Sequence, residues 1–493
     1  MNVKATPHKD CAVLLKKKGA IFIMRKLKRI LAGIISMSAV LTAAVSCADK
    51  DSSESSVQEI SETATEAATE NKVDISGQTI CWVADYDINP SEGEQRSTAL
   101  AIFEDTYGGK VEYIKADPTE KFATVSKRIA AGEPVDMLPF EQGSVPEGLK
   151  QNLYQPLDNY FEAMGYGGEE DIWADMSEAA EMFKYKDAHY VVPYSVSDPF
   201  LLIYSRKLIK ADKLNDPYEL YKSGKWDWDA MSSIMTKFVS KADEYDERYG
   251  ICGFFGNAAV QSTGVPVVSN ENGTFTSNLA SPELEKAELF MKKISDSGLY
   301  NKELYSRYPD DESTLFYAAG DWAMGVSNGR NEDMDLMAVP FPKAPKAENN
   351  YMLCNYNAKM LGANSDKGEA VATYLKCERM AVTQEKFKSA AKEQALEVVN
   401  TATGYKKSFV TEEQYDAIQS YLDTSAFKPV YEFGYGMGEK MYGEGKFTAE
   451  TRGAVNNAEN LLLNGGTEEI TTWKELSAKI KSDVDAAVSS YNN

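Results

Sequence analysis

Residues 77–140 read GQTICWVADYDINPSEGEQRSTALAIFEDTYGGKVEYIKADPTEKFATVSKRIAAGEPVDMLPF. Three short apolar or alternating segments in this stretch, 79–83, 110–114 and 135–140, have the composition of β-strands. Segments of helical length separate them, and strands that alternate with helices form parallel sheets with right-handed crossovers. The stretch therefore predicts an α/β fold built on a mainly parallel sheet.

The two segments between these strands have helical periodicity. Leu100, Phe103 and Tyr107 follow one another at spacings of three and four residues, and Gly108 is placed to end that helix. Thr119 is the expected N-cap of the second helix, because its hydroxyl can accept a hydrogen bond from a free backbone N–H group. Both helices should pack on the sheet through their apolar faces.

Polar and aromatic residues follow the first and third strands of this sheet. Asp85 and Tyr86 come after the first strand, and Glu141 and Gln142 come after the third. Ligands of open α/β sheets bind beyond the carboxyl ends of the strands. We therefore expect these four residues to lie at one edge of the sheet and to contact a ligand there.

The middle of the chain predicts further strands and helices. We expect strands at 190–194 and 201–204, on either side of a polar break at 195–198, and another at 336–341. Ser281, which a proline follows, has the position of an N-cap at the start of an amphipathic helix. No internal repeat is evident.

Charge and histidine content exclude several classes of function. The formal net charge is −22 at pH 7, which argues against nucleic acid as a partner, because phosphate binding relies on clustered Lys and Arg. The chain has only two histidines, His8 and His189, and we expect His189 to be a surface or half-buried residue on a strand. Neither a metal site nor a cofactor is expected.

Other motifs favour structural interpretations. Cys81, Cys252, Cys354 and Cys377 are widely spaced and form no CxxC pair, so we expect buried thiols, with one disulfide left open. Residues 325–329 (GVSNG) match the GxSxG nucleophile elbow, but no histidine follows them, so we expect a loop after a strand.

The N-terminus has the features of an export signal. A basic cluster that follows Met24 precedes an apolar run, and small residues then precede Cys47. This arrangement is similar to the lipobox of bacterial lipoproteins, which predicts a signal peptide over 1–46, a palmitate-type lipid on Cys47 and a flexible linker over 47–75. The protein would then be anchored by lipid at the outer face of the cell membrane. A transmembrane anchor is the alternative.

Five short motifs after residue 76 carry a family resemblance. In chain order they are AGEPVD (131–136), PY (193–194) followed by LIYSRK (202–207), GKWDWD (224–229), the segment 316–326, and VPFP (339–342). Together they resemble the bacterial extracellular solute-binding proteins of the maltose-binding type, although Ser205 stands where that family usually has Asn. The resemblance covers most of the chain after residue 76.

The resemblance implies a two-lobed, periplasmic-binding-protein-like α/β fold with crossovers near 196–200 and 334–340. Residues 76–196 and 340–405 would form the first lobe, and residues 200–334 and 406–493 would form the second. Such proteins are not enzymes. They capture a small molecule, most often a sugar or oligosaccharide, and deliver it to the permease subunits of an ABC transporter, and we expect a monomer.

Sugar recognition needs ring faces that cover C–H groups and planar polar groups that bind hydroxyls. We expect such residues in loops at strand ends and crossovers, whereas Trp226, Trp228 and Trp322 lie at helical spacing and are expected in the core. Asn328 and Arg330 follow an expected strand that contains Ala323 and Met324, where the family presents ligand contacts. The candidate ligand-binding residues are Asp85, Tyr86, Glu141, Gln142, Tyr194, Phe255, Asn257, Asn328, Arg330, Asn355, Tyr356 and Tyr435.

Two alternatives stay open at this point. A secreted glycoside hydrolase needs a pair of carboxylates, and a chain with 75 acidic residues cannot lack candidates for them. A binding protein of the same fold could also take a peptide or a polyamine. The sequence names neither the ligand nor the importer.

Overall fold

The computed structural model describes residues 74–91, 95–168, 171–243, 247–253, 255–301, 312–330, 332–396, 410–443, 453–455 and 472–492. All of them belong to the same structural unit of the chain. The expected signal peptide, Cys47 and nearly all of the linker lie outside these residues. Among the helices of the described part, none has both the length and the apolar character that crossing a membrane requires.

The first sheet is built on the stretch that opens the sequence. Its strands are β1 (Thr79–Ala84), β2 (Lys110–Lys115), β3 (Met137–Pro139) and β12 (Lys359–Leu361), in the order β12-β3-β1-β2. β1 pairs in parallel with both β2 and β3, which confirms the predicted parallel arrangement. β12 comes from far along the chain and pairs antiparallel with β3.

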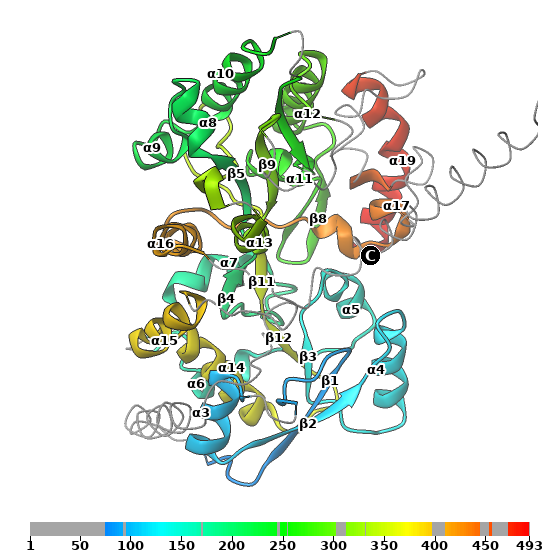
Figure 1. Ribbon diagram of the computed structural model, residues 1–493. Helices are drawn as coiled ribbons and strands as arrows, with labels where there is room; N and C mark the ends of the chain where they lie inside the picture. The colour runs from blue at the N-terminus through cyan, green and yellow to red at the C-terminus, as the bar shows by residue number, and fades with distance from the viewer. Residues whose placement is uncertain are drawn as a thin grey trace, which may run out of the picture. The chain divides into compact units, whose positions relative to one another are not determined.

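Alternating residues of β1 bury opposite faces of this sheet. Ile80 and Trp82 belong to one hydrophobic cluster, together with residues of α3 (Thr98–Tyr107) and α14 (Gly368–Thr383). Val83 points to a second cluster, which includes Val125 of α4 (Lys121–Ala130). Since successive side chains of a strand point to opposite faces, the sheet is covered on both sides (Figure 1). We call this sheet with its helices the first lobe.

The start of α4 differs from the prediction. The helix begins at Lys121 with Glu120 in the N-cap position, and no side chain caps it. Thr119 instead donates its hydroxyl to Asp117 Oδ1 at 2.6 Å, and its backbone N–H binds the same oxygen at 2.8 Å. The local turn thus competes successfully for the hydroxyl that was expected to cap the helix.

The second sheet is mixed and forms the second lobe with its helices. Its strands are β5 (Phe200–Ser205), β6 (Tyr249–Gly253), β9 (Thr314–Gly320) and β10 (Leu336–Pro340), in the order β10-β5-β9-β6. β5 runs antiparallel to β9 and β10, whereas β6 runs parallel to β9. The carboxyl ends of β6, β9 and β10 therefore meet at the same edge as the beginning of β5.

The helices of the second lobe bury apolar stripes on this sheet. α10 (Trp228–Val239) packs against β6, and α12 (Pro282–Asp296) packs against α11 (Gly256–Gln261). Ser281 caps α12 as predicted, because its Oγ accepts a hydrogen bond from the backbone N–H of Leu284 at 3.1 Å. The other helices and short strands are α5 (Glu147–Lys150), α6 (Phe161–Met164), α7 (Ser177–Met182), α8 (Arg206–Ala211), α9 (Pro217–Lys222), α13 (Trp322–Arg330), α15 (Glu385–Leu396), α16 (Glu412–Tyr421), α17 (Glu439–Tyr442), α19 (Trp473–Asn492), β7 (Val268–Glu271) and β8 (Thr274–Ser277), with 3-10 turns η1 (Gln142–Ser144), η2 (Asp158–Tyr160), η3 (Ala174–Met176), η4 (Glu332–Met334) and η5 (Phe433–Gly436).

A two-stranded sheet joins the lobes where the sequence suggested a polar break. β4 (Ser195–Ser197) pairs antiparallel with β11 (Asn355–Asn357). Residues 190–194 form no strand, contrary to the prediction. Pro193 has no N–H group to donate; the N–H of Tyr194 binds Asn357 O at 2.8 Å, but its carbonyl accepts from the side chain of Arg379 at 2.8 Å and not from a strand.

The prediction for residues 325–329 is also wrong. They lie in α13, together with Ala323 and Met324, and not in a loop after a strand. β9 ends at Gly320, and the backbone N–H of Met324 already binds Asp321 O at 2.9 Å. Ala323 and Met324 thus lie in the first turn of the helix and not in the strand that was expected there.

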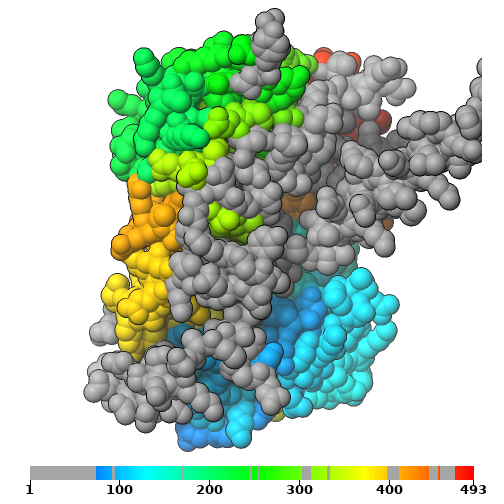
Figure 2. Space-filling view, in the orientation of Figure 1, coloured from blue at the N-terminus to red at the C-terminus, as the bar shows by residue number. Residues whose placement is uncertain are grey.

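The C-terminal helices contact both lobes. α15 packs on α14 of the first lobe, and α16 packs on β10 of the second. In the space-filling view, α16 (orange) lies between α15 (yellow) and the green surface of the second lobe (Figure 2). The division of residues 340–493 between the lobes at 405 stays a prediction.

Cys81, Cys252, Cys354 and Cys377 are buried, as expected, and no two of them form a disulfide in the described part of the chain.

Alanine substitutions at two glycines test how closely backbone atoms pack in the second sheet. Both Gly253 and Gly224 have positive φ, +94° and +71°, but a Cβ on Gly253 would lie 2.5 Å from Ala318 O, whereas a Cβ on Gly224 would meet nothing within 4 Å. Gly224→Ala should cost about 1 kcal/mol through backbone strain, and Gly253→Ala about 2–4 kcal/mol, because overpacking adds to the strain. Urea unfolding would measure both, and equal losses would contradict the packing argument.

Candidate functional site

A lysine joins the two predicted carboxylates at the edge of the first sheet. Asp85 follows β1 and Glu141 follows β3, and Lys121, the first residue of α4, lies between them. Its Nζ is 3.0 Å from Asp85 Oδ1 and also pairs with Glu141. Although burial opposes it, hydrogen bonds to both carboxylates raise the pKa of Lys121, so the lysine stays charged.

Sequence reasoning missed Lys121. Its position at the start of a helix that follows β2 was the available signal, because helix N-termini also lie at the carboxyl edge of a parallel sheet.

Aromatic rings surround a second lysine at the same edge. Lys359, at the start of β12, is only 5% exposed; its Nζ donates to Tyr194 Oη at 2.9 Å and to Glu378 Oε1 at 2.6 Å. The Nζ also lies 4.7 Å from the centre of the Tyr194 ring. The predicted residue Tyr194 is thereby fixed in position, and burial raises its pKa well above the ordinary value.

Tyr86 presents its ring at this edge. Its backbone oxygen accepts a hydrogen bond from Trp82 Nε1 at 2.9 Å, and the two rings meet edge to face with centres 5.4 Å apart. The side chain is nevertheless 38% exposed. The first lobe therefore combines paired carboxylates with an accessible ring.

The second sheet has a comparable edge. Asp198 lies between β4 and β5, and Asp321 and Trp322 directly follow β9. Because Phe200 pairs with Gly320, these residues meet at one end of the sheet. Asn355 joins them, since its Nδ2 donates to Asp198 Oδ2 at 2.8 Å.

Trp322 corrects an expectation about the core. Trp226 and Trp228 are buried, at 4% and 2% exposure, as predicted, but Trp322 is 49% exposed. Helical spacing placed all three in the core, yet Trp322 starts α13 at the open end of the sheet. Its position directly after β9 would have distinguished it, but the strand end was predicted too late in the chain.

Asp321 holds its proton more tightly than an ordinary aspartate. Burial, and then the negative charge of Asp198, raise its pKa from 3.8 to about 6. In the described part of the chain, neither carboxylate forms an ion pair with Lys, Arg or His. The edge of the second lobe is therefore acidic and partly protonated near pH 6.

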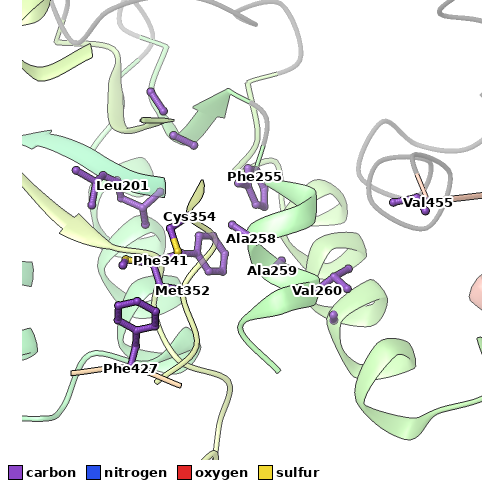
Figure 3. Close-up of a cluster of buried hydrophobic side chains, with 14 of the residues drawn as sticks. Leu201, Phe255, Ala258, Ala259, Val260, Phe341, Met352, Cys354, Phe427 and Val455 are labelled. Atoms are coloured by element: carbon purple, nitrogen blue, oxygen red, sulfur yellow. The ribbon is translucent and has the colours of Figure 1, made fainter. Parts of the chain in front are cut away.

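Three predicted site residues are buried among internal contacts. Phe255 is 0% exposed and stacks against Phe341 with ring centres 6.0 Å apart; Figure 3 shows it among the buried side chains around α11. Tyr356 is 5% exposed and donates its hydroxyl to Val430 O. Asn328 is 7% exposed and donates to Gln414 Oε1 at 2.6 Å. Internal contacts thus occupy most of their polar and ring surface.

Of the other predicted residues, Asn257, Tyr435 and Gln142 keep accessible surface. Asn257 Nδ2 lies 3.4 Å from Tyr435 Oη, and both side chains are half-buried. Gln142 is exposed in η1. The side chain of Arg330 lies outside the described part of the chain.

His189 has a structural environment. Contrary to the expectation of a surface or half-buried residue on a strand, it is buried and lies outside any strand. Its Nδ1 is 2.8 Å from Asp158 Oδ1, and its Nε2 is 3.0 Å from Glu181 Oε1. Across the described ranges, no group of three or more His, Cys, Asp and Glu side chains is arranged to hold a metal ion.

A cavity of about 400 Å³ lies beside β11. Residues of η3 and α7, the segments 348–350 and 424–429, and Tyr356 line it. It shares no lining residue with either sheet edge.

Comparison with known proteins identifies the family. The profile described as bacterial extracellular solute-binding protein matches residues 98–372, which is more than half of the chain. The chain belongs to this family. No curated protein matches it.

Solved structures of such proteins share the two-lobed fold. The sugar-binding protein MalE from Xanthomonas citri is 13% identical, with a TM-score of 0.56 over 84% of this chain and 98% of that one. The cyclic alpha-maltosyl-1,6-maltose binding protein from Arthrobacter globiformis is 12% identical, with a TM-score of 0.55 over 83% and 98%. The galacto-N-biose-/lacto-N-biose I-binding protein from Bifidobacterium longum is 10% identical, with a TM-score of 0.54 over 85% and 99%.

Family membership decides between binding and catalysis. This solute-binding protein captures a small molecule outside the cytoplasm and is not an enzyme. The glycoside hydrolase alternative is thereby set aside.

Asp198 and Asp321 should make the free energy of unfolding depend on pH. The folded pKa of Asp321 lies above the unfolded one, so the free energy of unfolding should fall as the pH rises from 3.8 to about 6. Asp321→Asn should remove this part of the fall, and Asp198→Asn should reduce it, because burial is the larger cause. Urea unfolding between pH 4 and pH 7 would compare the three proteins, and identical slopes would contradict the assignment.

Proposed function

We propose that this protein binds a sugar or oligosaccharide between the edges of its two sheets and delivers it to the permease subunits of an ABC importer. The observation that carries this proposal is that each edge combines carboxylates with an accessible aromatic ring: Asp85 and Glu141 with Tyr86, and Asp198 and Asp321 with Trp322. Ring faces cover sugar C–H groups, and carboxylates bind pairs of hydroxyls.

The charge of the first edge suits a neutral ligand. Each carboxylate there has a lysine partner: Lys121 pairs with both Asp85 and Glu141, and Lys359 pairs with Glu378. Hydroxyl groups can then replace or share these hydrogen bonds without leaving a buried charge unpaired, which would be costly. An anionic ligand would be repelled by Asp198 and Asp321 at the second edge, which form no ion pair within the described part of the chain.

Several structures with this fold support a sugar as the ligand class. Their names record binding of tagatose, lacto-N-biose and a cyclic maltosyl-maltose. At 10–15% identity they share the fold alone, so the residue types at the two edges carry the argument. The other ligand classes that this fold could take are peptides and polyamines.

Lipid anchoring is part of the proposal. Small residues precede Cys47, and the Ser-, Thr- and Glu-rich segment to residue 75 can serve as a flexible tether. The protein would then work as a monomer held by lipid at the outer face of the cell membrane, close to its importer.

Substitutions at each edge test the sugar site. A thermal-shift screen of mono- and oligosaccharides identifies a ligand, because a ligand at 100 times its Kd stabilises by about 2.7 kcal/mol. Glu141→Gln should then raise Kd about 10- to 100-fold, through loss of a charge-assisted bond worth about 1.5–3 kcal/mol. Tyr86→Ala and Trp322→Ala should each raise it about 2- to 10-fold through loss of a ring face.

Tyr442→Ala is the matched control, because Tyr442 is 39% exposed on α17, outside both edges. It should bind as the wild type does. Calorimetry that finds wild-type affinity in all three edge variants would place the site elsewhere. Stabilisation by spermidine or peptides, with no response to any sugar, would favour the other ligand classes.

A cysteine substitution tests the anchor. Cys47→Ala should release the protein from the membrane fraction or leave it unprocessed, because the lipid-bearing thiol is gone. Cys11→Ala is the control, since Cys11 precedes the expected start at Met24. Normal processing and membrane retention of the Cys47 variant would contradict lipidation.

A further inference from the structure

The segment 430–437 connects β11, one strand of the pair that joins the lobes, with both lobes. At its start, the backbone N–H of Val430 donates to Tyr356 Oη at 3.2 Å, and that hydroxyl donates to Val430 O at 3.3 Å. Since Tyr356 belongs to β11, the segment is tied to the strand pair between the sheets. Phe433 continues the contact by packing on Phe183 of the first lobe and Phe275 of the second.

Glu432 attaches this segment to the second lobe through its side chain. The residue is 2% exposed, and its carboxylate accepts three backbone N–H groups. Val267 donates to Oε2 at 2.6 Å, Val268 donates to Oε1 at 3.0 Å, and Gly434 donates to Oε1 at 2.8 Å. Val268 belongs to β7, Val267 directly precedes that strand, and Gly434 is the second residue of η5.

The other side of η5 rests on the first lobe. A Cβ on Gly436 would lie 2.3 Å from Val145 O and 2.8 Å from Gln142 O, so the two backbones touch. Between these contacts, Tyr435 reaches Asn257 Nδ2 with its hydroxyl at 3.4 Å. Three residues that the sequence marked as ligand contacts, Gln142, Asn257 and Tyr435, are thus brought together by one segment.

We propose that Glu432 is a positioning residue for ligand binding, because its carboxylate holds residues 430–437 between β7 and η1 and so keeps Tyr435 in place. This inference rests on the proposed function for its effect on affinity. Its structural part, the connection from β7 through η5 to η1, can be tested without any ligand.

The chemistry of the site requires an acceptor with two oxygens. All three polar neighbours of the carboxylate are donors, and burial raises the pKa of Glu432 to about 7. The titratable neighbour is Tyr431, whose own pKa burial and then Glu432 raise. A glutamine has the same size but would direct an NH₂ group at a backbone N–H donor. The loss of this hydrogen bond should loosen residues 430–437. Because glutamine carries no buried charge, global stability should change little.

The first experiment measures hydrogen exchange in the ligand-free, full-length chain. Glu432→Gln should speed exchange about tenfold at the amides of η5 and also at those of η1, while the amides of α10 stay as in the wild type. Glu439→Gln, which removes an exposed carboxylate on α17, is the matched control and should change nothing. Faster exchange confined to Val267, Val268 and Gly434 would overturn the proposed connection.

The second experiment measures binding of maltose, lacto-N-biose and D-tagatose. For a sugar that binds the wild type, Glu432→Gln should raise Kd about tenfold at an unchanged ligand-free melting temperature. In a Tyr435→Ala background the same substitution should have no further effect, because the residue through which it acts is gone. Additive effects, or wild-type affinity in Glu432→Gln, would overturn the positioning role. If none of the sugars binds the wild type, the sugar proposal fails, and the exchange measurement still decides the connection.

Discussion

The antiparallel pairing of β4 with β11 is the constraint on which the site depends. The chain leaves this pair in both directions: β4 leads through Asp198 into β5 of the second sheet, and β11 leads into β12 of the first sheet, which begins with Lys359. Asn357 binds Ser195 Oγ at 3.0 Å, and Asn355 binds Asp198 at 2.8 Å. One short strand pair thereby fixes where each sheet begins and which polar groups stand at its edge.

Much of the fold could be predicted because its signals are local. The strands and helices of the first sheet follow from alternation and from spacings of three and four residues, and the cap at Ser281 follows from one side chain. The failures arose where a tertiary contact outweighs local preference. Residues 190–194 are apolar enough for a strand, but the partner strand β11 pairs with the more polar 195–197. Thr119 does not cap α4, because its hydroxyl binds Asp117 instead.

The candidate site was predictable only in part. Asp85 and Glu141 follow neighbouring parallel strands, so topology alone brings them together. Lys121 and Lys359 were missed and Trp322 was wrongly assigned to the core, because their importance comes from pairing and exposure, which no spacing encodes. Conversely, Phe255 and Tyr356 lie at strand ends and crossovers but face inward, since a loop position does not reveal which side of the chain is covered.

The four buried thiols have a consequence for life outside the cytoplasm. Burial raises the pKa of Cys354 to about 12, and it raises the pKa values of Cys81 and Cys377 above the ordinary range. Because the thiolate is the form that attacks disulfides and oxidants, this shift keeps Cys354 in its unreactive thiol form at neutral pH. An exported protein with free cysteines would ordinarily risk cross-linking in an oxidising compartment. Here the core itself shields the sulfur atoms, so burial protects these thiols where a disulfide otherwise would.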